Sequence, residues 1–192
     1  MSKRILVLNG NPKPVSLCHD IAQAYAGAAQ TAHEVRRVDL SALSFDSNLA
    51  VGYDAQQPLE PDLQAFQQSV TWAQHLVVVA PVWWGGLPAQ FKGLFDRTFL
   101  PGFAFRYEKE QVWPSRLLKG RSATLLLTLD TPPWYFRWFQ GAPAVRQLDT
   151  ATLAFSGFAP VRHHLFGPVI KSDAAQRQRW LAKAAVLGAK GG

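Results

Sequence analysis

Short apolar runs alternate along this chain with longer segments in which apolar residues recur every three or four positions. The runs are too short for helices and are bounded by Gly, Asn and Pro, so they predict buried strands at residues 3–9, 34–40, 76–81, 123–129 and 158–166. The periodic segments predict helices at 17–30, 63–74, 88–99 and 173–187, with Ser16 and either Ser172 or Asp173 as N-caps and Pro88 in a first turn. This alternation predicts a parallel sheet covered on both faces, a doubly wound α/β sandwich of about five strands.

In sheets of this kind, ligands bind beyond the carboxyl ends of the strands, where the strand order reverses. Three loops follow predicted strands, at residues 9–18, 81–87 and 128–135. We therefore expect the functional site in these loops.

Composition narrows the class of protein. A chain of 192 residues fits one domain, which we expect to span residues 1–192. The apolar runs are much shorter than a membrane-spanning helix, and polar residues follow the first run at once, so we expect neither a membrane span nor an export signal. A single cysteine excludes an intramolecular disulfide and fits a cytoplasmic protein. The net charge of +7 favours anionic partners, but the basic residues are spread along the chain, which argues against nucleic acid.

The first loop, NGNPKPVS at residues 9–16, leads directly into a predicted helix start, where free N–H groups attract phosphate. Asn11 and Ser16 offer hydrogen bonds, and Lys13 offers a charge. An ordinary turn with a capping serine explains the same residues equally well. The glycine motifs of dinucleotide-binding and nucleotide-hydrolysing loops do not occur in the sequence.

Several other side chains invite a chemical role but have a simpler explanation. Cys18 lies near a helix N-terminus, where a thiol can be reactive, but no base can be assigned to it and a packed side chain is favoured. His163 and His164 are adjacent and would point to opposite sides of a strand, so we expect no metal site. Lys92 and Asp96 have the spacing of an ordinary ion pair on a helix.

The second loop places two indoles beside two glycines, at Trp83, Trp84, Gly85 and Gly86. Glycines let backbone N–H groups approach a flat ligand, and aromatic side chains can pack around it. Packing in the core or in a dimer interface is the alternative.

The run PVWWGGLPAQFKGLFDRTF at residues 81–99, followed by GFAF at 102–105, resembles a motif of the flavodoxin-like NAD(P)H:quinone oxidoreductases. That family includes the DT-diaphorase type and the ancillary subunits of glutathione-gated potassium efflux systems, and the resemblance covers most of the chain. It implies a flavodoxin-like three-layer sandwich with a five-stranded parallel sheet in the order 2-1-3-4-5. It also implies a bound flavin, either FMN or FAD, with FMN slightly favoured.

The resemblance assigns roles to residues in all three loops. The flavin phosphate would be held by Asn11, Ser16, Leu17 and Cys18, the ring by Pro81, Val82, Trp83, Trp84 and Gly85, and the pyrimidine end of the ring by Thr128, Leu129, Asp130 and Thr131. The family often has histidine where Asn11 stands and asparagine where Cys18 stands, and it usually has a glycine-rich turn where this chain has residues 128–133. Because Pro132 and Pro133 lack an N–H, donors to a reduced flavin would come from residues 129–131.

Tyr135 would correspond to a tyrosine on the substrate side of the flavin, with Phe136 competing for that position. The aromatic cluster at 134–139 fits a cap over the ring and a dimer contact equally well.

The implied activity is a two-electron, ping-pong transfer of hydride from NADH or NADPH through the flavin to a quinone-type acceptor. A cytoplasmic homodimer is implied, with segments 99–107 and 134–139 as candidate contacts. The alternative is a flavin-binding regulatory or ancillary subunit of a membrane transport system. An electron carrier like flavodoxin is disfavoured, because such carriers are usually acidic and this chain is basic.

Overall fold

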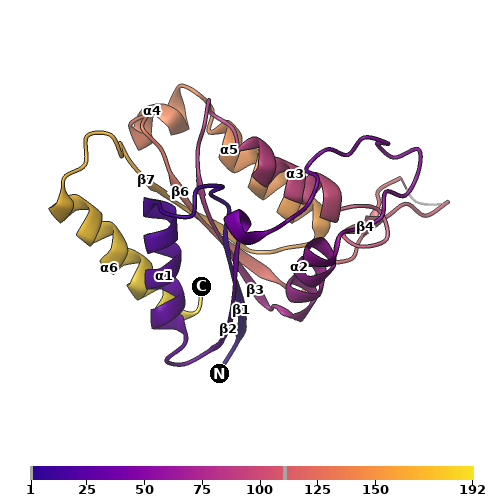
Figure 1. Ribbon diagram of the computed structural model, residues 1–192, viewed down its shortest axis with the longest axis horizontal. Helices are drawn as coiled ribbons and strands as arrows, with labels where there is room; N and C mark the ends of the chain where they lie inside the picture. The colour runs from indigo at the N-terminus through magenta and orange to yellow at the C-terminus, as the bar shows by residue number, and fades with distance from the viewer. Residues whose placement is uncertain (1, 110–111) are drawn as a thin grey trace.

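A five-stranded parallel sheet forms the centre of the computed structural model, which describes residues 2–109 and 112–192 (Figure 1). Its strands are β1 (Arg4–Asn9), β2 (Glu34–Asp39), β3 (His75–Pro81), β6 (Ser122–Thr128) and β7 (Val161–Phe166). They lie in the order β2-β1-β3-β6-β7, and all neighbouring pairs are parallel. This order confirms the predicted flavodoxin-like sheet, 2-1-3-4-5 when only its own strands are counted.

The burial of each strand follows its place in the sheet. Every residue of the central strand β3 is buried, and β1 is buried from Ile5 to Asn9. The edge strands β2 and β7 are only partly buried and carry basic residues, Arg36 and Arg37 on one and Arg162 on the other. Charged side chains on edge strands are a common protection against pairing with other chains.

Helices cover both faces of the sheet. They are α1 (Leu17–Ala29), α2 (Pro61–Trp72), α3 (Ala89–Thr98), α4 (Pro133–Trp138), α5 (Pro143–Arg146) and α6 (Ala174–Lys190), with a 3-10 turn η1 (Leu40–Ala42) and a π-helix η2 (Gln147–Ala154). Helices α1 and α6 pack on one face, and α2, α3, α5 and η2 pack on the other, so the sheet lies between two apolar layers (Figure 1). No helix in the described part of the chain is long and apolar enough to cross a membrane.

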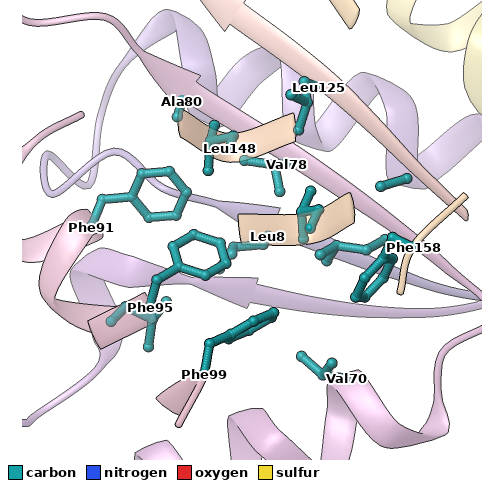
Figure 2. Packing of buried hydrophobic residues seen from close by; sticks show 14 of the residues in the cluster. Leu8, Val70, Val78, Ala80, Phe91, Phe95, Phe99, Leu125, Leu148 and Phe158 are labelled. Carbon is teal, nitrogen blue, oxygen red and sulfur yellow. The ribbon is translucent and has the colours of Figure 1, made fainter. Parts of the chain in front are cut away.

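Helix α3 fixes the core beneath the second loop. Phe91 and Phe95 of this helix and Phe99, its C-cap, follow one another at a spacing of four residues, with ring centroids 5.2 and 4.9 Å apart in edge-on contacts. Figure 2 shows these rings against Leu8 and Val78 of the sheet. The predicted helix over 88–99 is confirmed, except that Pro88 is the N-cap and does not belong to the first turn.

Two helix starts agree with the sequence. Ser16 caps α1 by accepting a hydrogen bond from the N–H of His19 at 3.2 Å, and Asp173 caps α6 by accepting one from Gln176 at 2.6 Å. The last strand is shorter than predicted and begins at Val161, directly after Pro160. Proline has no N–H to donate to the ladder between β7 and β6, which explains the later start.

Besides the turn η1, two regions have structure that the sequence pattern did not predict. Helices α4, α5 and η2 occupy residues 133–154, and the short strands β4 (Phe105–Arg106) and β5 (Ser115–Arg116) form a separate antiparallel pair. Figure 1 shows β4 at the right of the molecule and α4 at its upper left.

Candidate functional site

Three loops meet at the carboxyl ends of β1, β3 and β6. These strands are consecutive neighbours in the sheet, so the loops that follow them come together although they are far apart in sequence. The order in which successive strands are added to the sheet reverses at β1, because β2 lies on one side of β1 and β3 lies on the other. Ligands of open α/β sheets bind at this reversal.

Side-chain hydrogen bonds hold the first loop in shape. The Asn9 side chain is fully buried, donates to Asp39 at 2.9 Å and accepts from the N–H of Asn11 at 3.2 Å. The Asn11 side chain in turn accepts from the N–H of Lys13 at 2.9 Å. These bonds curl the loop toward the start of α1, whose first N–H groups, on Leu17 and Cys18, have no partner within the helix. The chain thus presents free donors and a lysine at the positive end of a helix, which suits an anion.

Gly10 lets this loop pass against α3. A Cβ placed on Gly10 would lie 2.6 Å from the ring of Phe91, closer than side chains approach one another in proteins. The N–H of Gly10 also donates to the carbonyl of Val79 at 2.7 Å. The loop is therefore tied to both β3 and α3.

Cys18 is buried beneath the loops and is not set up as a nucleophile. Burial raises the pKa of its thiol to about 11, and hydrogen bonds to Thr128 and Asn11 offset only part of this effect. Its Sγ lies 3.2 Å from the Oγ1 of Thr128. This side chain links the first and third loops, in agreement with the packing role favoured from the sequence.

The second loop is a tight turn. Trp83 and Gly86 exchange backbone hydrogen bonds of 3.0 and 2.9 Å, and the two residues between them have positive φ, 52° for Trp84 and 77° for Gly85. Glycine adopts this conformation freely, whereas it is strained for tryptophan. The Trp84 side chain is fully exposed, and that of Trp83 is 44% exposed, so neither indole is a core residue. In the described part of the chain, the N–H groups of Trp84 and Gly85 have no partner.

The third loop supplies fewer donors than the sequence indicated. The N–H of Leu129 already donates to the carbonyl of Phe166 at 3.0 Å, so it is not free for a ligand. The Asp130 carboxylate accepts from the N–H of Ile170 at 2.8 Å. Among the described residues, the N–H groups of Asp130 and Thr131 have no acceptor, which narrows the expected donors from residues 129–131 to these two.

Two cavities open where the loops meet. The first, of about 350 Å³, is lined by Asn11, Lys13, Ser16, Leu17, Cys18, Pro81, Val82, Trp83, Thr128, Leu129, Asp130, Val169 and Arg177. The second, of about 900 Å³, is lined by Val82, Trp83, Trp84, Gly85, Leu129, Asp130, Thr131, Phe136, Gln140 and Pro143. They share four residues and have the sizes typical of ligand sites. All the residues assigned to flavin from the sequence line one or the other.

The structure adds Arg177, which the sequence did not assign to the site. It lies in the first turn of α6 and lines the first cavity together with Lys13. Two cations and the start of α1 thus line the same cavity.

Tyr135 and Phe136 point in different directions. Phe136 is buried and lines the second cavity. Tyr135 is 42% exposed and stacks on Phe139, with ring centroids 5.2 Å apart and planes 10° from parallel. Of the two residues that compete for the substrate side, the geometry therefore places Phe136 at the cavity and Tyr135 on the outer surface of α4.

Two further pairs behave as ordinary structure. Lys92 and Asp96 form an ion pair with a 2.6 Å hydrogen bond, which confirms the i,i+4 contact expected from the sequence. His163 contacts the Arg137 guanidinium at 2.5 Å. Within residues 2–109 and 112–192, no group of three His, Cys, Asp or Glu side chains could hold a metal ion.

Comparison with known proteins agrees with this architecture. The model of a family described as having the flavodoxin-like fold matches residues 3–187. The chain is 31% identical over 128 residues to a ribosyldihydronicotinamide dehydrogenase (quinone) of Pongo abelii, covering 62% of this chain and 52% of that one. It is 30% identical over 132 residues to an FMN-dependent NADH:quinone oxidoreductase of Pseudomonas savastanoi pv. phaseolicola, covering 64% of each. The matched region thus spans between about half and two thirds of the length of these curated relatives.

A solved structure is similar over nearly its whole length. The crystal structure of Smu.1420 from Streptococcus mutans superposes with a TM-score of 0.83 at 28% identity, covering 97% of this chain and 99% of that one.

Proposed function

This chain belongs to the flavodoxin-like fold family, and from that premise we propose that it is an FMN-dependent NAD(P)H:quinone oxidoreductase. The observation that carries the proposal is the meeting of three loops around two cavities that share four residues, one lined by two cations and a helix start and the other by aromatic side chains. The names of the relatives favour this enzyme over the alternative of an ancillary transport subunit.

The residues present fit a flavin. The free N–H groups of Leu17 and Cys18, with Lys13 and Arg177, would hold the phosphate. The N–H groups of Trp84 and Gly85 would face one edge of the isoalloxazine ring. This division matches the chemistry of the molecule, which is anionic at one end and flat and apolar at the other. The relative named as an FMN-dependent NADH:quinone oxidoreductase favours FMN over FAD.

A bound flavin supplies the two-electron chemistry, accepting hydride from a nicotinamide and giving it to an acceptor. The residues of the chain would bind the flavin, orient it and exclude water from the site. The N–H groups of Asp130 and Thr131 would stabilise negative charge at the pyrimidine end of the ring. Trp83, Trp84 and Phe136 would wall the second cavity, where the nicotinamide and a quinone would bind in turn.

Ser16→Asp tests the phosphate site. Aspartate is as good an N-cap as serine, so α1 should remain folded while a carboxylate is placed beside the phosphate. We expect affinity for FMN to fall by about tenfold or more, measured by fluorescence quenching on titration of the apoprotein. The matched control is Ser16→Asn, which keeps the cap without the charge and should retain most of the affinity.

Purified protein that is colourless and binds no added FMN would overturn the proposal. Equal FMN affinity for Ser16→Asp and Ser16→Asn would mean that the phosphate lies elsewhere. Measuring the mass of the released cofactor distinguishes FMN from FAD.

We extend the proposal to the working form of the protein, a cytoplasmic homodimer in which residues 1–192 act as one flavin-binding domain. Two substrates that use one cavity in turn predict ping-pong kinetics. Sedimentation equilibrium measures the dimer, and initial-rate kinetics with NADH or NADPH against a soluble quinone measure the order of binding. Intersecting double-reciprocal lines would contradict the shared cavity.

A further inference from the structure

A chain of hydrogen bonds leads from the edge of the sheet into the first loop. Asn9 and Asp39 are paired at the carboxyl ends of β1 and β2, and the Asn9 amide nitrogen donates to Asp39 at 2.9 Å. The Asn9 oxygen accepts from the N–H of Asn11, and the Asn11 oxygen accepts from the N–H of Lys13. Asn11 and Lys13 line the first cavity, whereas Asp39 lies outside it. Asp39 is thus linked to this cavity through two side-chain amides.

The charge on Asp39 determines which way the Asn9 amide points. Burial alone would raise the pKa of the Asp39 carboxyl, but the interactions with Arg37, Asn9 and His19 outweigh it and hold this pKa below its ordinary value. An ionised carboxylate can only accept hydrogen bonds, so it faces the amide nitrogen of Asn9. The amide oxygen is then left for the N–H of Asn11. The reversed amide would bring an oxygen against the carboxylate and a nitrogen donor against that N–H.

Arg37 neutralises this carboxylate and holds it in place. Its guanidinium donates to the same oxygen of Asp39 at 2.8 Å, to Nδ1 of His19 at 3.0 Å and to the side chain of Gln23. His19 and Gln23 belong to α1, which packs on this face of the sheet (Figure 1). The end of β2 is therefore tied to the helix whose start lines the first cavity. A carboxylate paired in this way repels a nearby anion less than an unpaired one.

We propose that Asp39 is a positioning residue for the phosphate end of the flavin site, acting through Asn9. By fixing the Asn9 amide it holds residues 11–13 in the shape that receives the phosphate, without contact with the flavin. A loop that is already ordered loses less conformational freedom on binding, which raises affinity. This inference rests on the proposed function, because the phosphate is that of the flavin.

The sign of the effect separates positioning from simple charge repulsion. A carboxylate near a phosphate weakens binding, so loss of its charge alone should strengthen the binding of FMN. A positioning role predicts the opposite, because loss of Asp39 frees the Asn9 amide to turn and loosens the loop.

The test measures the affinities of the apoprotein for FMN and for riboflavin, which lacks the phosphate, by fluorescence quenching. Asp39→Leu removes the acceptor at similar volume, so FMN affinity should fall by about tenfold while riboflavin affinity stays within about twofold. Asp39→Asn keeps the one oxygen that accepts from both Asn9 and Arg37. It should therefore rescue FMN affinity to within about threefold of the parent.

Two further variants control for charge and for folding. Asp20→Asn removes an exposed carboxylate from the first turn of α1, and it should bind FMN as tightly as the parent or more tightly. Arg37→Gln leaves Asp39 without its cation. It should weaken FMN by about threefold or more and spare riboflavin, which tests the same chain of bonds without a change at Asp39.

Hydrogen exchange in the apoprotein provides a readout that needs no flavin. The N–H groups of Asn11 and Lys13 should exchange slowly in the parent and in Asp39→Asn, because both are bonded to side-chain oxygens. In Asp39→Leu they should exchange faster by about tenfold or more.

The outcomes distinguish this inference from the proposed function. If the parent binds neither flavin, the proposed function fails and the role of Asp39 fails with it. If the parent binds both, an unchanged ratio of FMN to riboflavin affinity in Asp39→Leu, or tighter FMN binding, would refute the positioning role alone. Equal loss of both flavins in Asp39→Leu and Arg37→Gln would assign these residues to overall stability and would also refute it.

Discussion

Trp84 occupies a backbone conformation that suits glycine or asparagine. Its φ of 52° lies in the left-handed region, which costs a bulky residue about 1 kcal/mol, and its fully exposed indole recovers nothing through burial. Strain of this kind persists where a side chain has a use, here as a wall of the second cavity. We therefore expect Trp84→Asn to stabilise the apoprotein by about 1 kcal/mol, measured by urea unfolding.

The matched control is Trp113→Asn. Trp113 also has an exposed indole, but its backbone φ is not positive. Its unfolding free energy should stay within about 0.5 kcal/mol of the parent. Equal effects at the two positions would show that the conformation of Trp84 is not strained.

His75 makes stability depend on pH. Burial lowers its pKa to about 4, with further lowering by Lys3, Arg162 and His33, and its Nδ1 lies 2.8 Å from the Ser122 hydroxyl. In the unfolded chain this histidine titrates near pH 6.5, so between pH 6.5 and 4 the unfolded state binds a proton that the folded state does not. The free energy of unfolding should therefore fall as pH is lowered from 6.5 to 4, by an amount on the order of 3 kcal/mol. Above pH 6.5, His75 should not affect it.

The variant His75→Gln removes the titrating group. Its free energy of unfolding in urea, measured from pH 4.5 to 7.5, should depend less on pH than that of the parent, whatever its stability at pH 7.5. Parallel curves for the two proteins would show that His75 is not the source of the dependence.

Among the elements, α1 and α6 approach each other closely because one residue lacks a side chain. A Cβ on Gly188 of α6 would lie 2.2 Å from the backbone carbonyl oxygen of Tyr25 in α1, and a helix backbone cannot move aside locally. We expect Gly188→Ala to destabilise the protein by about 2 kcal/mol, measured by urea unfolding. Gly27→Ala, on the exposed side of α1 with nothing within 4 Å of its Cβ, should stabilise by about 0.5–1 kcal/mol. If both substitutions changed the free energy of unfolding in the same direction, a tight contact at Gly188 would be contradicted.

The same elements show which local patterns the sequence reveals. Strands β1, β3 and β6 are short apolar runs closed by turn residues, and they were predicted to within two residues at each end. Helix η2 was missed because its i→i+5 bonding breaks the 3.6-residue period on which the prediction relies. Helix α4 was missed because the pair Pro132 and Pro133 suggests a loop, whereas Pro132 is the N-cap and Pro133 the first residue of the helix.

At the scale of the whole molecule, the sequence predicted the loops of the site more completely than the groups that complete it. The three loops follow from topology, since ligands bind at the carboxyl ends of parallel strands. Arg177 joins them only because α6 returns beside β7, and nothing in its local sequence marks it. The same limit applies to Phe136, whose direction depends on how α4 packs.

A ligand that touches all three loops should stabilise them together. FMN at about 100 times its dissociation constant should add about 2.7 kcal/mol to the free energy of unfolding. Hydrogen exchange should slow at the same time in residues 9–18, 81–87 and 129–131, because each segment supplies donors to one molecule. Riboflavin, which lacks the phosphate, should protect 81–87 and 129–131 while leaving 9–18 close to its unliganded rate. Protection by FMN in a single loop would mean that these cavities do not act as one site, because a flavin bound as proposed cannot contact one segment without the others.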